Sequence, residues 1–187
     1  LNEHTKREAL DNLLAPLRAG ADVGLLSEAG CPAVADPGAN LVALAQMEGI
    51  RVVPLIGPSS LLLALLSTIA GMGTTLLLAL MASGLNGQRF AFQGYLPAKE
   101  AERTKSLRDL ESESRKRAQT QLFIETPYRN RAMFDAILAA CQPGTRLTVA
   151  TDLTLPGESI RTLTIQQWKK QTPPDIERRP TVFLLLA

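Results

Sequence analysis

Four short loops in this sequence combine acidic, hydroxyl and glycine residues directly after apolar runs. They are SEAGCP (27–32), IGPSS (56–60), ETPYR (125–129) and TDLTLPGES (151–159). In an open α/β sheet, such loops lie beyond the carboxyl ends of the strands, where their backbone N–H and C=O groups can bind a ligand. Gly30 and Gly57 lack a Cβ, which lets the backbone approach that ligand closely. We therefore expect these loops to form a ligand site.

The sequence disfavours several common kinds of site. No loop contains the G-x-G-x-x-G fingerprint of a dinucleotide site or the P-loop of an ATPase. The single histidine, His4, and the two cysteines, Cys31 and Cys141, stand in unrelated contexts, so we expect no metal cluster. Because no histidine is near Cys31 in the sequence, we interpret it as a buried small residue rather than a nucleophile. Few cysteines and no apparent secretion signal favour a cytoplasmic setting.

Hydrophobic spacing predicts the elements that position the first two loops. Thr5 and Glu8 form a capping box before an amphipathic helix that ends at Gly20. Residues 23–26 and 50–55 are short apolar runs typical of buried strands, with a helix over residues 41–49 between them. A strand, a helix and a strand within about 30 residues predict a βαβ unit with parallel strands.

The second half repeats this alternation of strands and helices. We predict strands over 90–92, 120–125, 146–151 and 181–187, and helices over 100–118, 127–141 and 164–170. The chain divides near residues 87–97. The predicted fold class is therefore α/β with two domains, an incomplete one over 1–88 and a second one over 89–187.

Positive charge is concentrated in the second half of the chain. Residues 89–187 contain 16 Lys/Arg and 11 Asp/Glu, against 4 and 7 in residues 1–88. A basic surface suits a polyanion such as RNA, because phosphate contacts supply most of the non-specific affinity. Residues 99–117, however, mix 7 basic and 5 acidic side chains, which is also typical of a solvated helix face.

An uncharged segment interrupts the α/β pattern. Residues 61–81 are long enough to cross a bilayer, which needs about 20 apolar residues. Gly71 and Gly73 fall in the middle of the segment and favour a break between two short helices, so we expect no membrane span. The segment also contains a repeat, since SSLLLAL (59–65) returns as TTLLLAL (74–80). A local duplication would explain it.

Four stretches together resemble a known family. They are LLSEAGCPAVADPGANLV (25–42), GIRVVPLIGPSS (49–60), FAFQGYLPAK (90–99) and LFIETPYRN (122–130). The chain resembles the tetrapyrrole methylase-type (class III) S-adenosylmethionine-dependent methyltransferases, especially the bacterial 16S rRNA ribose 2′-O-methyltransferase branch. The resemblance implies two α/β domains around a cofactor cleft, methyl transfer from S-adenosylmethionine, and a cytoplasmic role in rRNA processing. It also implies a homodimer, whose interface could bury the apolar residues 76–85.

Carried over residue by residue, the resemblance implies a site built from three of the loops. The implied cofactor-binding residues are Ser27, Glu28, Ala29, Gly30, Cys31, Pro32, Gly57, Pro58, Ser59, Glu125, Thr126 and Pro127. Tyr128 and Arg129 are implied to contact the substrate; the alternatives are packing for Tyr128 and a surface ion pair for Arg129. Asp36 is expected to be the N-cap of the helix that follows the first loop.

Acidic residues are the candidates for proton transfer. Methylation of a ribose hydroxyl needs in-line positioning and a group that accepts the hydroxyl proton. The catalytic candidates are Glu28, Glu125 and Asp152, and Glu158 is a further acid beside them. Each has a plain alternative, because an acid in a loop can also cap a turn, accept backbone N–H groups or lie in solvent.

The sequence departs from the family pattern in three places. The family begins with a strand and a glycine loop roughly 45 residues before the position of Leu1, as part of its first βαβ unit, so we expect the N-terminal strand to be missing. ETPYR stands where the ribosomal branch has E-S-P-H-R, and TDLTL stands where it has R-E-L-T-K. RNA is the first expected substrate, with a tetrapyrrole or another small molecule as the alternative. An inactive fragment or a binding module is the third reading.

Overall fold

The chain divides into two units between Gln88 and Arg89. A computed structural model describes residues 5, 7–27, 31–35, 37–55, 57 and 72–187. Unit 1 is Leu1–Gln88 and unit 2 is Arg89–Ala187. All strands of the described part of the chain lie in unit 2, so the mixed α/β class is confirmed there.

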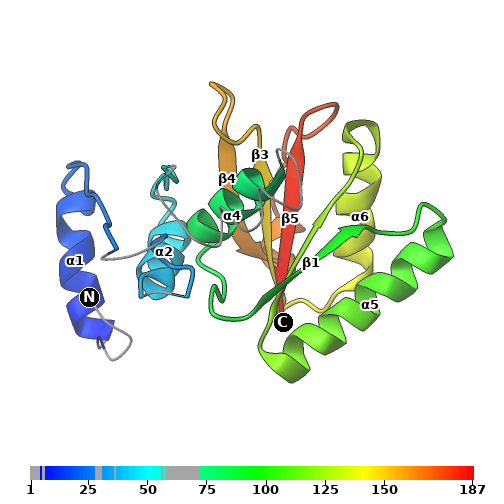
Figure 1. The fold of residues 1–187 in the computed structure, drawn as a ribbon, viewed down its shortest axis with the longest axis horizontal. Coiled ribbons are helices and arrows are strands. Elements are labelled where there is room, and N and C mark those ends of the chain that lie inside the picture. The colour runs from blue at the N-terminus through cyan, green and yellow to red at the C-terminus, as the bar shows by residue number, and fades with distance from the viewer. Residues whose placement is uncertain (1–4, 6, 28–30, 36, 56, 58–71) are drawn as a thin grey trace. The chain divides into compact units, whose positions relative to one another are not determined.

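In its described part, unit 1 is helical. It contains α1 (Arg7–Arg18), α2 (Ala39–Met47) and α4 (Met72–Ser83), shown from blue to green in Figure 1. A small core joins Leu10 and Leu14 of α1 to Leu41 and Ala45 of α2. The predicted amphipathic helix is therefore confirmed, because α1 places Leu10 and Leu14 against a neighbouring helix, whereas Leu13 is exposed.

The predicted strands over 23–26 and 50–55 are wrong. Neither segment forms a strand, and Leu26 and Leu55 are 91% and 75% exposed. An apolar run becomes a strand only when a neighbouring strand accepts and donates its backbone hydrogen bonds. These two segments pair neither with each other nor with another described segment of unit 1.

The start of α2 also differs from the prediction. The N-cap is Gly38 instead of Asp36, and no side chain caps the first turn. Gly38 has φ 135°, and a Cβ there would come within 2.8 Å of Leu25 Cδ2, so glycine is required at this position. The observed cap thus lies two residues after the predicted one, and the helix begins at Ala39.

Unit 2 is a five-stranded mixed sheet in the order β1-β2-β5-β3-β4. The strands are β1 (Phe90–Tyr95), β2 (Thr120–Ile124), β3 (Arg146–Thr151), β4 (Ser159–Thr164) and β5 (Thr181–Leu186). Only β1 and β2 pair in parallel, and β5 lies antiparallel between β2 and β3. Four strands confirm the predicted ones, whereas β4 was not predicted.

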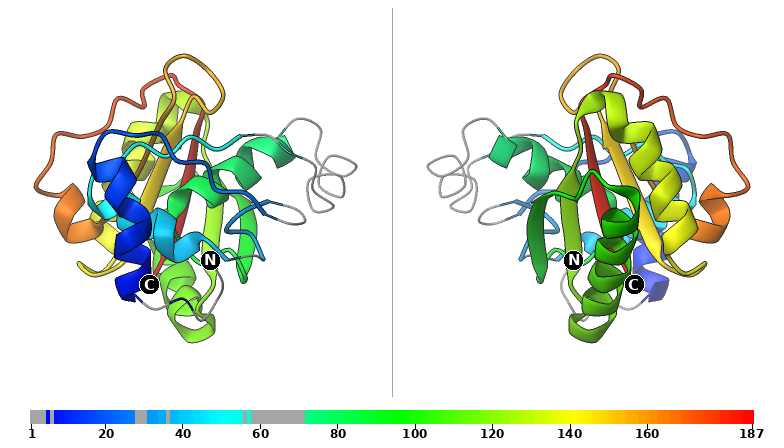
Figure 2. Two further views of the ribbon diagram at one scale, coloured as in Figure 1. Left: turned by 90° about the vertical axis from the view of Figure 1, so that its left-hand side faces the viewer. Right: turned by 90° about the vertical axis from the view of Figure 1, so that its right-hand side faces the viewer.

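Helices cover one face of this sheet. They are α5 (Glu100–Arg117), α6 (Asn130–Ala140) and the short α7 (Ile165–Trp168), with a 3-10 turn over Pro127–Arg129. The right-hand view of Figure 2 shows α5 and α6 side by side in front of the strands. The predicted helices over 100–118 and 164–170 are confirmed in position, and the one over 127–141 begins with the 3-10 turn.

The core of unit 2 lies between these helices and the sheet. Phe123 of β2 stacks on Phe183 of β5 at 5.8 Å, and Phe134 of α6 meets Trp168 edge-on at 5.4 Å. The Trp168 indole N–H donates to the backbone oxygen of Leu147 over 2.9 Å, so the only polar atom of this buried ring is satisfied. One aromatic pair lies within the sheet and the other joins α6 to α7, while the Trp168 hydrogen bond ties α7 to β3.

The apolar segment does not produce a membrane helix in the part of the chain that the structure describes. No described helix is both long enough and apolar enough to cross a bilayer. The second copy of the repeat (74–80) lies in α4, which has 12 residues. The first copy (59–65) lies outside the described residues.

Cys141 follows α6 and is expected to be chemically inert in the folded protein. Burial, with a smaller contribution from the Glu111 carboxylate, raises the pKa of its thiol to about 12. Since the thiolate is the reactive form, we expect no alkylation of Cys141 by iodoacetamide near pH 8 in the native protein. Complete alkylation is expected after denaturation, with peptide mass spectrometry as the measurement. Rapid labelling of native Cys141 would contradict this.

Candidate functional site

The direction of β5 brings three segments of unit 2 to one end of the sheet. In the register, Val182 is opposite Ile124 of β2, and Thr181 is opposite Thr151 of β3. The residues before β5 therefore lie beside those that follow β2 and β3. Two backbone hydrogen bonds join them: Arg178 N donates to Pro127 O over 3.1 Å, and Asp152 N donates to Pro180 O over 2.9 Å.

Glu125 is the first residue after β2, and its side chain is fully buried. Its Oε1 accepts hydrogen bonds from Thr126 N over 2.6 Å and from Arg129 Nη2 over 2.7 Å. Thr126 Oγ1 and Arg129 Nε donate to the same oxygen, each over 3.1 Å. Oε2 is buried and accepts no hydrogen bond from the described residues. This oxygen is thus an acceptor to which a ligand or a water can donate.

The 3-10 turn explains this geometry. Pro127 occupies its first position, where a missing N–H costs nothing, and Arg129 N donates to Thr126 O over 2.8 Å. The tight turn brings the Arg129 guanidinium back over Glu125, four residues earlier in the chain. Of the alternatives for Arg129, the ion pair is present, and its partner is a buried carboxylate rather than a surface one.

Tyr128 lies on the outside of the same turn. It is 74% exposed, so the packing alternative does not describe it. The Arg129 guanidinium carbon is 5.7 Å from the centroid of its ring, within the range of a cation–π contact. An exposed ring beside a cation is the arrangement that stacks on a nucleic-acid base.

Asp152 is held by an arginine that sequence analysis did not single out. Its Oδ2 accepts a hydrogen bond from Arg179 Nε over 2.9 Å and forms an ion pair with Arg179 Nη2 at 2.8 Å. Arg179 also bonds the Asp175 carboxylate and the Gly157 carbonyl. Its hydrogen bonds to Asp152 raise the pKa of Arg179. Arg179 stands directly before β5, so its position could be found only from the direction of that strand.

The loop after β3 has an unusual backbone. Asp152 and Thr154 have φ values of 49° and 69°, and Arg178 has φ 58° in the facing segment. A β-branched residue such as Thr154 rarely adopts this conformation, and such strain is often found at functional sites. Glu158 Oε2 accepts a hydrogen bond from Thr154 N over 2.9 Å, which holds the turn. Glu158 therefore has the plain role of a loop acid.

The remaining predicted site residues belong to unit 1. Cys31 is buried, and Ser27, Pro32 and Gly57 are half-buried. The others lie outside the described residues: Glu28, Ala29, Gly30, Pro58 and Ser59. The predicted cofactor site draws on both units and stays a prediction. No group of three or more His, Cys, Asp or Glu side chains in the described ranges is placed to hold a metal ion.

Comparison with known proteins finds related sequences. No protein-family model matches the chain. It is 31% identical over 187 residues to Ribosomal RNA small subunit methyltransferase I of Escherichia coli O157:H7, covering 100% of this chain and 59% of that protein. The chain is 35% identical over 166 residues to the protein of the same name from Pseudomonas aeruginosa, covering 89% of this chain and 52% of that protein. It is 36% identical over 165 residues to the protein of the same name from Mesorhizobium japonicum, covering 88% of this chain and 50% of that protein.

These relatives confirm the predicted resemblance at two levels. The chain is related in sequence to methyltransferases. More particularly, each of these three relatives carries the name Ribosomal RNA small subunit methyltransferase I. The chain spans 50–59% of the length of these three relatives.

Solved structures with some likeness are methyltransferases too. The methyltransferase CobJ aligns with 17% identity and a TM-score of 0.38 over 100% of this chain and 73% of its own. Cobalt precorrin-4 methyltransferase CbiF aligns with 18% identity and a TM-score of 0.37 over 98% of this chain and 72% of its own. Scores this low carry no argument about the site.

Proposed function

We propose that this chain is part of an S-adenosylmethionine-dependent methyltransferase that acts on the ribose 2′-O of small-subunit ribosomal RNA. The observation that carries the proposal is the similarity along all 187 residues to a protein named for this class of substrate. The setting proposed with it is the cytoplasm. A homodimer is also proposed, but residues 76–80 are already buried and do not offer an exposed interface.

Glu125 offers a group that suits the proposed cofactor. Glu125 Oε2 is a buried acceptor without a donor among the described residues, and S-adenosylmethionine carries hydroxyl and amine donors. When bound, it supplies an electrophilic methyl group on a positively charged sulfur. The residues proposed to hold it are Ser27–Pro32, Gly57–Ser59 and Glu125–Pro127.

The proposed substrate contacts are Arg129 and Tyr128. Arg129 is held in place by Glu125, and its side chain remains 31% exposed. A guanidinium fixed in this way can still donate to a phosphate, and the exposed Tyr128 ring can stack on a base. Both contacts position the RNA, and positioning supplies most of what methyl transfer needs from the protein.

The proton acceptor is proposed among Glu28, Glu125 and Asp152. One oxygen of Glu125 and one of Asp152 are engaged by arginines. This geometry favours positioning roles for both carboxylates, with Glu125 oriented toward the cofactor and Asp152 stabilising its loop. Glu28 lies outside the described residues and remains a candidate.

Isothermal titration of S-adenosylmethionine and S-adenosylhomocysteine into the 187-residue chain tests the proposal first. We expect binding with a micromolar Kd, which corresponds to about −8 kcal/mol. Transfer of a radiolabelled methyl group to small-subunit RNA, followed by nucleoside analysis for a 2′-O-methyl group, tests the substrate. Absence of binding at millimolar cofactor, or methylation of a base instead of a ribose, would contradict the proposal.

A further inference from the structure

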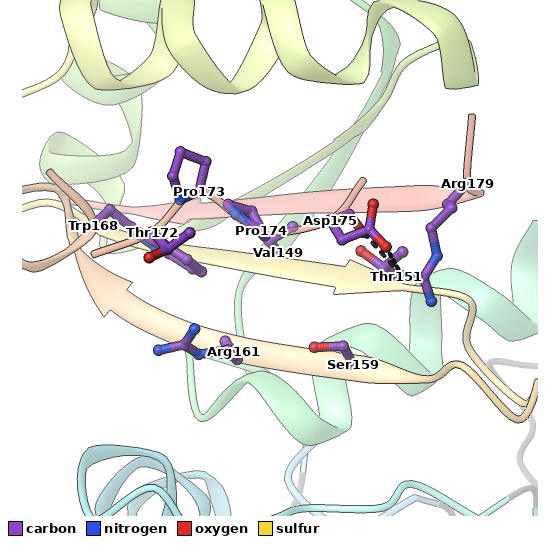
Figure 3. Close-up of a pocket in the computed structure, with 10 residues that line it drawn as sticks. All are labelled: Val149, Thr151, Ser159, Arg161, Trp168, Thr172, Pro173, Pro174, Asp175 and Arg179. Atoms are coloured by element: carbon purple, nitrogen blue, oxygen red, sulfur yellow. Dashed lines mark hydrogen bonds and ion pairs between the residues drawn. The ribbon is translucent and has the colours of Figure 1, made fainter. Parts of the chain in front are cut away.

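Unit 2 contains a pocket of about 270 Å³ on the face of β3 and β4 that also carries the helices. Val149 and Thr151 of β3 line it together with Ser159 and Arg161 of β4, which are their neighbours in the register. Figure 3 shows the opposite wall, which the segment 172–175 forms as it runs alongside these strands. None of these residues belongs to the loop over 125–129.

The pocket is stiff before any ligand binds. Pro173 and Pro174 each fix their own φ, and each restricts the residue before it to an extended conformation. At one end, Arg179 bonds the carboxylates of Asp175 and Asp152, which fastens this wall to the loop after β3. A wall held in this way loses little conformational entropy when a ligand enters.

Opposite charges mark the two ends of the pocket. At one end, the Arg161 guanidinium lies 5.3 Å from the centroid of the Trp168 ring and donates one hydrogen bond, to Gln171 Oε1 over 2.6 Å. Arg161 forms no ion pair with any acid in the described part of the chain, so most of its N–H groups can bind an anion. At the other end, Asp175 is 81% exposed and uses only Oδ2 for Arg179.

Between these ends the lining includes the apolar side chains of Val149, Pro173 and Pro174. The two proline rings offer an apolar surface without N–H donors, on which a planar ring can lie. Ser159 is exposed and lies on the same face of β4 as Arg161, and it is opposite Thr151 in the register, toward the Asp175 end. A ligand that matches all these features carries an anion, a planar ring and an N–H donor in that order.

We propose that this pocket binds one nucleotide of single-stranded RNA. The phosphate lies at Arg161, the base lies against Pro173 and Pro174, and its exocyclic amine donates to Asp175. The inference rests on the proposed RNA substrate and adds a second contact with that RNA on unit 2. Adenine, cytosine and guanine carry an exocyclic amine, whereas uracil has a carbonyl where cytosine has its amine.

Trp168 allows the pocket to be tested directly, because it is the only tryptophan of the chain. We expect CMP and AMP to change its emission, since a phosphate bound to Arg161 partly neutralises the positive charge that lies over the Trp168 ring. UMP and inorganic phosphate are expected to bind at least tenfold more weakly than CMP. An unchanged emission at millimolar CMP, or equal affinity for CMP and inorganic phosphate, would overturn the proposal. Tighter binding of a phosphoserine peptide than of CMP would overturn it as well.

Two variants and a control measured by calorimetry identify the contacts. Arg161→Gln is expected to weaken CMP binding about tenfold to a hundredfold, the loss of a charge-assisted hydrogen bond. Asp175→Asn should remove the preference for CMP over UMP. Arg131→Gln alters an exposed arginine of α6 that pairs with Asp135, and it should bind CMP like the unchanged protein. Arg161→Gln with unchanged CMP affinity and an unchanged circular dichroism spectrum would refute the assignment.

S-adenosylmethionine titration separates the two proposals. Arg161→Gln should bind the cofactor with unchanged affinity, because the pocket lies outside the cofactor loops. Normal cofactor binding without a nucleotide response overturns only the pocket. Absent cofactor binding in the unchanged chain speaks against the proposed function, whatever Trp168 reports.

Discussion

Glu125→Gln is expected to weaken S-adenosylmethionine binding about tenfold to a hundredfold while the protein stays folded. Glutamine keeps the shape of the side chain, and its oxygen can still accept the hydrogen bond from Thr126 N. Its amide places donors where Oε2 now offers only an acceptor, so a donor on the ligand meets another donor. Hydrogen bonds to charged groups contribute about 1.5–3 kcal/mol, which sets the size of the effect. Calorimetric titration measures it.

Glu177→Gln is the matched control for this prediction. Glu177 is an exposed glutamate in the segment before β5, so its replacement changes the charge by the same amount near the same end of the sheet. We expect its cofactor affinity to stay within about twofold of the unchanged protein, as for surface substitutions in general. Equal affinities for both variants would show that Glu125 does not contact the cofactor.

Phe183→Ala is expected to lower the free energy of unfolding of unit 2 by about 3–5 kcal/mol, the usual cost of truncating a buried phenylalanine. Phe183 is fully buried in β5 and stacks on Phe123 at 5.8 Å. Small domains have about 5–15 kcal/mol of stability in total, so this loss is a large share. Urea unfolding followed by the emission of Trp168 measures it, since Trp168 belongs to the same core.

Tyr95→Ala provides the comparison. Tyr95 is an aromatic residue of the same sheet, in the edge strand β1, but it is 57% exposed. We expect its replacement to cost less than about 1 kcal/mol, because little apolar surface leaves water there on folding. Similar unfolding midpoints for the two variants would contradict the described core.

Residue types and spacing predicted most of unit 2. The runs over 120–125 and 181–187 are apolar and β-branched, and they became β2 and β5 because they are buried on both faces. β4 was missed because SIRTLT is half-polar. It lies at the edge of the sheet, where only one side of the strand has a partner. The local sequence of an edge strand resembles that of a loop.

The candidate site was predictable only where it is local in sequence. Glu125 and Arg129 are four residues apart, so a single turn suffices to join them. Arg179 and Asp152 are far apart in sequence, and their contact depends on β5 running antiparallel to β3. An apolar run buried on both faces gives no indication of its direction. Runs 23–26 and 50–55 failed for a related reason, since composition does not supply a pairing partner.

The position of β5 also has a consequence during synthesis on the ribosome. β5 is the last of the five strands along the chain, yet it lies between β2 and β3 in the sheet. Until it emerges, β1 with β2 and β3 with β4 are two separate pairs, each with one unpaired inner edge. Unpaired edges bind other strands readily. Nascent unit 2 is therefore prone to aggregation until β5 has been synthesised and has paired with β2 and β3. We expect chaperones that bind exposed strand edges to protect it during this time.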